Sequence, residues 1–153
     1  MKGNVTEEAF NHWHAVAAFF KCFSYSRLVA VFGDVPYYET SFANSDLEAM
    51  YKDRDSRVFV MDKVHDMLKN EVLVNMRNND GANTLNRYVA AAFASRWMLF
   101  EGTWQKYHGG DQAAATKYLQ LAKEAAEIVI NSGKFAMSPT FILMVGLILS
   151  SKV

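Results

Sequence analysis

The chain has 153 residues, 51% apolar and 21% charged, which are the proportions of a single globular domain with a buried core. Its 16 basic and 16 acidic residues cancel, so the net positive charge that favours nucleic acid or an anionic membrane is absent, and we expect no nucleic-acid partner. The only cysteine, Cys22, excludes an internal disulfide and a zinc site built from cysteines.

The first predicted helix covers residues 6–32. Thr6 is the expected N-cap, and two glutamates follow it in the first turn, where the helix dipole favours acidic side chains. Apolar side chains recur at helical spacing in two adjacent stripes, which predicts packing on more than one side. The stripes are Phe10, Trp13, Ala17 and Phe20, and Val16, Phe19 and Phe23. Trp13 is therefore expected in the core.

The stretch "FGDVPYYE" predicts an abrupt end to this helix. Gly33 suits the left-handed position after a helix, Pro36 cannot continue one, and Val35 before the proline is expected to be extended. An extended backbone sends Tyr37 and Tyr38 to opposite sides of the chain, so the two rings cannot form one flat platform. We expect at least one of them to pack back on the helices.

The stretch that follows, up to the next helix, is a long loop that carries several aromatic and large apolar side chains, so we expect it to be ordered; such loops are often functional. The second predicted helix covers 56–74, with Asp55 or Ser56 as its cap. The third covers 85–102, is apolar on nearly every side and should be the most buried. Gly102 is expected to close it.

The fourth predicted helix covers 111–132, with Asp111 as its cap and Gly133 in the left-handed position after its end. No alternating strand pattern of any length is present. We therefore expect an all-α fold. Long helices joined by turns, with alanines where helices would cross, favour two stacked helical hairpins of the tetratricopeptide-like kind.

Metal-binding and catalytic patterns are weak. His12 and His14 are two positions apart and point in different directions on a helix, so we expect a solvated helix face there. Asp62 and His65 have a suitable spacing, but a metal site in a helical bundle needs several such pairs. No nucleophile with a base, phosphate loop or dinucleotide motif occurs. We expect no catalysis, no metal and no cofactor.

Four stretches, in this order, resemble the SusD/RagB family: "FGDVPYYE", "RDSR", "NRYVAAAFASRWMLFEGTW" and "AKEAAEIVINSGKF". The resemblance covers roughly residues 8–135. It implies a tetratricopeptide-like helical half that is largely scaffold and transporter contact. It also implies an outer-membrane lipoprotein of Gram-negative bacteria, exposed at the cell surface. Such proteins sit over a SusC-like TonB-dependent transporter and pass it oligosaccharides or other nutrients.

The chain departs from the family pattern in length, since family members are several times longer, and in lacking a secretion signal and the lipid-bearing N-terminal cysteine. We expect a SusD-like helical domain fragment over 1–135, and an apolar tail over 136–153 that departs from the family. The alternative is a cytoplasmic helical-repeat adaptor that binds a protein in its concave face. The net charge of zero and the absence of a secretion signal suit this alternative.

Two aromatic residues are candidates for stacking against a glycan. Trp104 is expected in a polar loop after the helix-ending glycine, and Tyr38 is the second candidate. Sugars bind by laying C–H groups on aromatic faces, although ordinary packing against helices remains the alternative for both residues. Trp97 lies on an apolar stripe and is expected in the core. Arg27, Arg87 and Arg96 are expected to pack their stems in the core with their heads paired, the alternative being contact with a ligand.

Overall fold

The computed structural model describes residues 5–43 and 45–136. Within these ranges the chain is helical and contains no strand, so the predicted all-α class is confirmed. The tetratricopeptide-like stacking of two hairpins stays a prediction. The predicted apolar tail, apart from its first residue, lies outside the described residues.

Helix α1 (Glu7–Phe32) begins and ends as predicted. The Thr6 hydroxyl oxygen accepts a hydrogen bond of 3.2 Å from the backbone N–H of Ala9. At the other end Gly33 has a φ of +73°, and its N–H donates to the carbonyl of Val29. A positive φ is strained for residues with a side chain, which explains the glycine.

The second helical run consists of α3 (Arg57–Met67), the π-helical segment η1 (Leu68–Val72) and α4 (Leu73–Asn75), close to the predicted range. Ser56 is its cap, accepting a bond of 3.3 Å from the N–H of Phe59. The π-helical turn was not predicted. It keeps both Leu68 and Val72 buried against the core.

Helix α5 (Arg87–Tyr107) continues past Gly102, so the predicted end of this helix is wrong. Gly102 is buried where α5 crosses α6 (Gln112–Asn131): a Cβ at this position would lie 2.7 Å from Cγ of Leu119. The glycine permits close approach of two helices, a tertiary role that local sequence does not reveal. As predicted, Asp111 caps α6, accepting bonds from two backbone N–H groups.

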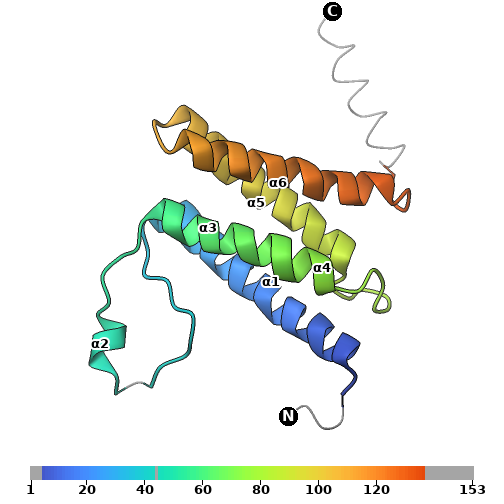
Figure 1. Ribbon diagram of the computed structural model, residues 1–153, viewed down its shortest axis with the longest axis horizontal. Helices are drawn as coiled ribbons and strands as arrows, with labels where there is room; N and C mark the ends of the chain where they lie inside the picture. The colour runs from blue at the N-terminus through green and yellow to red at the C-terminus, as the bar shows by residue number, and fades with distance from the viewer. Residues whose placement is uncertain (1–4, 44, 137–153) are drawn as a thin grey trace, which may run out of the picture.

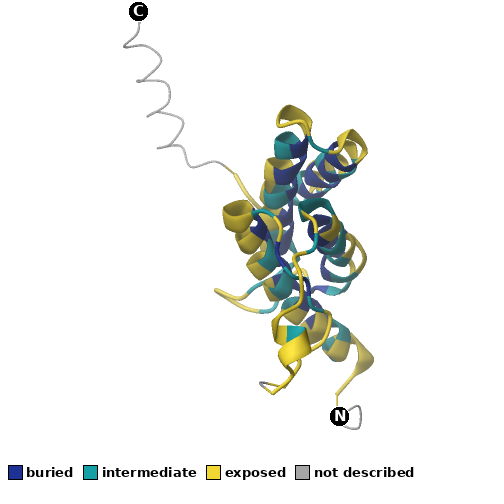
Figure 2. Ribbon diagram, turned by 90° about the vertical axis from the view of Figure 1, so that its left-hand side faces the viewer, coloured by how far each residue is buried: buried dark blue, intermediate teal, exposed yellow. Residues whose placement is uncertain are grey.

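The helices form two packed pairs that lie against each other (Figure 1). Helix α1 packs on the run from α3 to α4, and α5 packs along α6, while α3 also contacts α6. Ring contacts join the first helices of the two pairs: Phe19 of α1 lies 5.7 Å from Phe93 and 5.4 Å from Trp97 of α5, between ring centroids. The buried residues lie where the helices face each other (Figure 2).

The loop between α1 and α3 projects from the helices and carries a short helix, α2 (Leu47–Met50) (Figure 1). Its base is closed by an antiparallel bridge between Val35 and Asp55, in which the N–H of Asp55 donates to the carbonyl of Val35 at 3.2 Å. Tyr37 is buried and its ring lies 4.7 Å from that of Tyr25 of α1. One tyrosine of the pair thus packs back on the helices, as predicted.

Several apolar side chains expected in the core are exposed. Trp13 is 57% exposed, so its predicted place in the core is wrong; Trp97 is half-buried against the core. Helix α5 is not enclosed on every side, because Phe93 and Phe100 are exposed. By length and composition alone, α1 could span a membrane, its most apolar window having a mean hydropathy of 1.4. Core helices of soluble proteins pass the same test.

Candidate functional site

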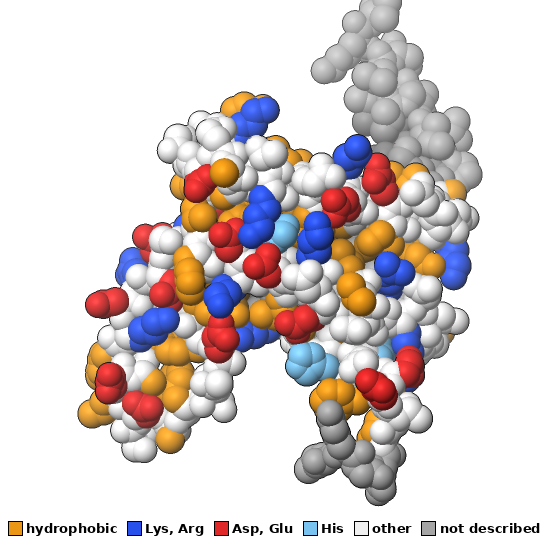
Figure 3. Space-filling model, viewed as in Figure 1, with side chains coloured by type: hydrophobic (Ala, Val, Ile, Leu, Met, Phe, Trp, Pro, Cys, Tyr) orange, Lys and Arg blue, Asp and Glu red, His pale blue; other side chains and the backbone are white. Residues whose placement is uncertain are grey.

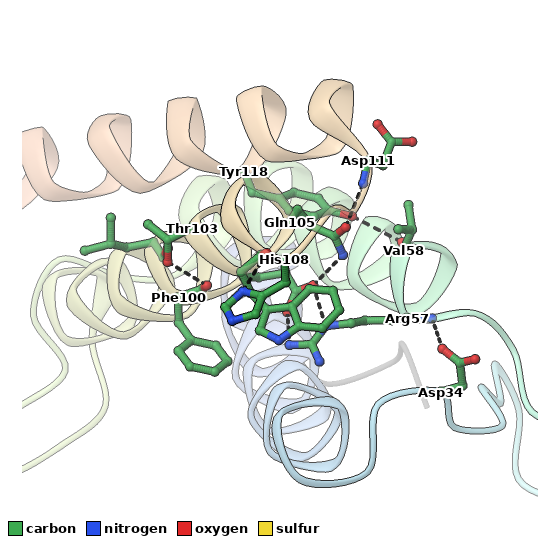
Figure 4. A network of polar contacts seen from close by, with 12 residues as sticks. Asp34, Arg57, Val58, Phe100, Thr103, Gln105, His108, Asp111 and Tyr118 are labelled. Atoms are coloured by element: carbon green, nitrogen blue, oxygen red, sulfur yellow. Dashed lines mark hydrogen bonds and ion pairs between the residues drawn. The ribbon is translucent and has the colours of Figure 1, made fainter.

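A buried ion pair joins the start of α3 to the middle of α5. Nε and Nη2 of Arg57 each donate a hydrogen bond of 2.8 Å to a different carboxylate oxygen of Glu101, which is 1% exposed. The side-chain amide of Gln105 donates to the same carboxylate at 2.9 Å, and its carbonyl oxygen accepts from the N–H of Asp111 (Figure 4). A buried charge is tolerated when its hydrogen bonds are satisfied in this way.

The segment before α3 is held to the end of α1 by two aspartates. The carboxylate of Asp34 accepts a bond of 2.8 Å from the N–H of Arg57, in the first turn of α3 (Figure 4). The carboxylate of Asp55 accepts from Nζ of Lys52 at 2.6 Å and from the N–H of Tyr37 at 2.7 Å. These two bonds, that of Lys52 first, lower the pKa of Asp55. The base of the loop is therefore a closed polar junction.

Trp104 lies inside α5, so its predicted place in a polar loop is wrong. The Arg57 guanidinium carbon lies 3.8 Å from the centroid of the indole ring, and the ring of His108 stacks on the indole at 5.3 Å with an interplanar angle of 13°. This is the geometry of a cation–π contact. The indole covers the ion pair from the outside. Its stacking on a sugar stays a prediction.

Tyr38 ties the loop to itself and to α1. Its N–H donates to the hydroxyl oxygen of Tyr25 at 2.8 Å, and its own hydroxyl donates to the carbonyl of Ala49 at 2.6 Å. Its ring lies 4.8 Å from that of Phe42. Tyr38 lines a hollow of 690 Å³ within the loop. It does not meet Trp104, which lines a different hollow beside Gly33, so the two candidates do not form one site.

His12 is completely buried, not on the solvated face expected for it. Its Nδ1 accepts a bond of 3.2 Å from the backbone N–H of Arg77, so the proton of the neutral ring is on Nε2, which lies 3.4 Å from a carboxylate oxygen of Asp80. His14 is exposed and faces Glu71 at 3.6 Å. In residues 5–43 and 45–136, no three His, Cys, Asp or Glu side chains gather in a group that could hold a metal ion.

Acidic and basic side chains are interspersed over α3 and α6 (Figure 3). Lys117 lies 2.9 Å from a carboxylate oxygen of Asp62 and 3.3 Å from one of Asp66. The Tyr118 hydroxyl also donates to Asp62, and burial raises the pKa of this tyrosine. Burial likewise raises the pKa of the Cys22 thiol to about 12, so this cysteine is not a reactive thiolate. These groups link helices and do not form a reactive pair.

A groove of 250 Å³ runs between α1 and α5, and we call it the aromatic groove. Its lining residues are Phe23, Ser26, Arg27, Ala30, Met61, Phe93, Arg96, Trp97, Phe100 and Glu101. Arg27 and Arg96 are exposed, and their guanidinium groups make no hydrogen bond or ion pair with any described residue. The prediction that their heads are paired is therefore wrong.

Comparison of the chain with models of protein families, with curated proteins and with solved structures finds no match. The sequence motifs and the geometry of the site are thus the guides to its role. Sequence reasoning missed Glu101 and Gln105, which lie one helical turn apart in an apolar helix. The signal available in the sequence was a carboxylate directly after the apolar run 97–100 and four residues before an amide.

Proposed function

We propose that this chain is the helical part of a nutrient-binding protein of the SusD/RagB kind, working at the cell outer membrane with a SusC-like TonB-dependent transporter. The nutrient is an oligosaccharide or another small solute. The helical part itself supplies scaffold and protein contact rather than sugar capture or catalysis. The observation that supports the proposal best is the convergence of three separate sequence motifs on Arg57.

These three motifs are far apart in the sequence. Asp34 comes from "FGDVP", Arg57 from "RDSR", and Glu101 and Trp104 from the third helix. The carboxylate of Asp34 holds the backbone of Arg57, the carboxylate of Glu101 holds its guanidinium, and Trp104 covers it. Because the loss of one member leaves a buried charge unpaired, such residues are expected to occur as a set. The family resemblance is carried by four stretches of sequence, and three of them supply the residues of this set.

The scaffold role follows from what the aromatic candidates contact. Trp104 is engaged by Arg57 and His108, and Tyr38 uses both its N–H and its hydroxyl within the loop. One or two rings add only about 0.5–1.5 kcal/mol each beyond area burial, whereas micromolar affinity requires about 8 kcal/mol. Capture of the nutrient therefore belongs to other parts of the intact protein.

The experiment incubates the purified, tagged chain separately with a soluble extract and with detergent-solubilised outer membranes of the native host, and identifies the retained proteins by mass spectrometry. We expect the chain to retain a TonB-dependent transporter from the outer-membrane extract. The matched comparison is a tagged Arg57→Met/Glu101→Leu variant, which lacks the buried ion pair and which we expect to keep the fold. Retention of proteins only from the soluble extract, without a transporter from the outer-membrane extract, contradicts the proposal.

A second candidate is the cytoplasmic helical-repeat adaptor. The aromatic groove favours it, because the groove lies between the first helices of the two packed pairs, where helical-repeat proteins have their concave face. An adaptor would retain a protein partner from the soluble extract. The two extracts therefore distinguish the two candidates.

A further inference from the structure

We infer that the aromatic groove between α1 and α5 binds a protein segment that presents aromatic or aliphatic side chains next to carboxylates. This inference goes beyond the proposed function, because it concerns the surface of these helices alone and does not depend on a SusC-like transporter or on a sugar.

The apolar part of the groove consists of rings that the protein leaves exposed. Phe23 is 39% exposed, Phe93 37% and Phe100 50%. Phe23 lies 5.9 Å from Trp97 and 6.4 Å from Phe93, between ring centroids, so the rings of both helices form one continuous surface. Clustered exposed rings of this kind mark places where proteins bind partners.

The charged part of the groove consists of arginine side chains without an ion-pair partner among the described residues. Arg27 and Arg96 both line it, and neither makes an ion pair or hydrogen bond with a described residue. Glu101 lines it too, but Arg57 and Gln105 already hold its carboxylate. The free charges of the groove are therefore both positive. A guanidinium beside an aromatic ring suits a carboxylate on an apolar partner.

A buried hydroxyl in the groove points to the same conclusion. Ser26 is only 8% exposed, and its Oγ has no hydrogen-bond partner in the described part of the chain. A buried hydroxyl without a partner is destabilising, because its bonds to water are lost and not replaced. Ser26 is next to Arg27 in α1, and both line the groove. A polar atom of a bound segment would satisfy it.

The extent of the surface favours a protein segment over a small molecule. Phe20, Phe23, Arg27 and Val31 recur at helical spacing on one face of α1, about 17 Å from end to end. On α5, Phe93, Arg96 and Phe100 repeat the same spacing. A segment of about three helical turns matches this length, and helix-in-groove binding uses side chains at this spacing.

The test measures binding of fluorescein-labelled amphipathic peptides of about three helical turns by fluorescence anisotropy. One peptide carries aromatic and acidic side chains, the second has lysine in place of each acid, and the third has serine in place of each aromatic. They are titrated with the wild-type chain and with Arg27→Glu/Arg96→Glu. Arg54→Glu is the control, because Arg54 is also exposed and lies in the loop before α3, outside the groove.

We expect the acidic aromatic peptide to bind the wild type at least about tenfold more tightly than the other two peptides. Arg27→Glu/Arg96→Glu should weaken binding of the acidic aromatic peptide by a similar factor and should make the lysine peptide the tighter ligand. Arg54→Glu should leave the affinities of both peptides unchanged. Phe100→Ser should weaken the acidic peptide without changing the charge preference. Circular dichroism shows whether each variant keeps its helices.

Equal affinity of the acidic and lysine peptides, or no binding of the acidic peptide, would overturn the inference. Sedimentation of the wild type alone supplies a further outcome. If the chain forms a dimer that the double charge reversal dissociates, a second copy occupies the groove, and the inference of a different, acidic partner is wrong. Binding to neutral lipid vesicles that Phe100→Ser abolishes would likewise contradict it.

Discussion

Arg57 and Glu101 are 44 positions apart in the sequence, yet the guanidinium of one donates two hydrogen bonds of 2.8 Å to the carboxylate of the other. Both side chains are buried in this contact, with 11% and 2% of their areas exposed. The pair joins the first turn of α3 to the middle of α5, and so connects the two packed pairs of helices.

Breaking this ion pair on one side should be costly. Arg57→Met leaves the Glu101 carboxylate buried without its cation, and we expect the free energy of unfolding to fall by about 3–5 kcal/mol. Urea denaturation measures it. Arg57→Met/Glu101→Leu should recover most of the loss, because no charge then remains buried. Lys123→Met, at the exposed pair with Glu127, should cost about 1 kcal/mol or less; an equal loss there would refute the distinction.

Gly102→Ala should destabilise the chain although alanine is the better helix former. The added Cβ would lie 2.7 Å from Cγ of Leu119, so the helices must separate. We expect this to lower the free energy of unfolding by about 1–3 kcal/mol. In a Leu119→Ala background this cost should shrink, because the side chain in the way is gone. Thermal unfolding of the four chains measures the coupling. Additive effects of the two substitutions would show that the close approach is absent.

Local signals in the sequence were sufficient for most helix boundaries. Thr6, Ser56 and Asp111 cap helices through bonds to residues two or three positions away, so their roles are visible in a short stretch of sequence. Gly33 ends α1 through its own backbone conformation, which is equally local.

Tertiary contacts explain what the sequence did not reveal. Gly102 resembles a helix-ending glycine until Leu119 is placed opposite it. A helix that ended at Gly102 would leave Trp104 in a loop, which is why the sequence predicts the wrong place for this residue. Its contact with Arg57, and the pairing of Arg57 with Glu101, join residues too far apart for any spacing rule to detect. The aromatic groove was hidden for the same reason, because its two sides come from different helices.

Gly33→Val should test the strained end of α1. Gly33 has a φ of +73°, and no atom lies within 4 Å of the place that a Cβ would take, so any cost comes from the backbone and not from a clash. We expect a loss of about 1–3 kcal/mol in the free energy of unfolding. Val31→Ala, an exposed change in the same turn, should stay within about 0.5 kcal/mol. A melting temperature unchanged by Gly33→Val would remove this explanation.

Acid should weaken the link between the start of α1 and the segment before α5. Arg77 donates to the carboxylates of Glu8 and Asp80, and these hydrogen bonds lower the pKa of both acids from ordinary values of 4.5 and 3.8. A carboxylate whose pKa is lower in the folded chain stabilises the fold at pH values above its ordinary pKa. This stability is lost as the pH falls from the ordinary pKa through the lowered one.

The urea midpoint of the wild type should therefore fall as the pH drops below about 4.5, and Arg77→Met should fall less steeply over the same range. Lys106→Met, at a lysine that contacts the ring of Tyr107 and no carboxylate in the described residues, should keep the wild-type pH dependence. Parallel curves for the wild type and Arg77→Met would show that this network does not contribute.

Scaffolding as opposed to sugar capture is tested most directly by isothermal titration calorimetry of the purified chain, and of Trp104→Ala, with a panel of oligosaccharides. If the indole covers the Arg57–Glu101 ion pair, neither protein binds a sugar with micromolar affinity, and Trp104→Ala lowers the free energy of unfolding. Micromolar affinity in the wild type that is lost in Trp104→Ala, with stability unchanged, would mean that Trp104 is a sugar-binding residue and that the scaffold assignment is wrong.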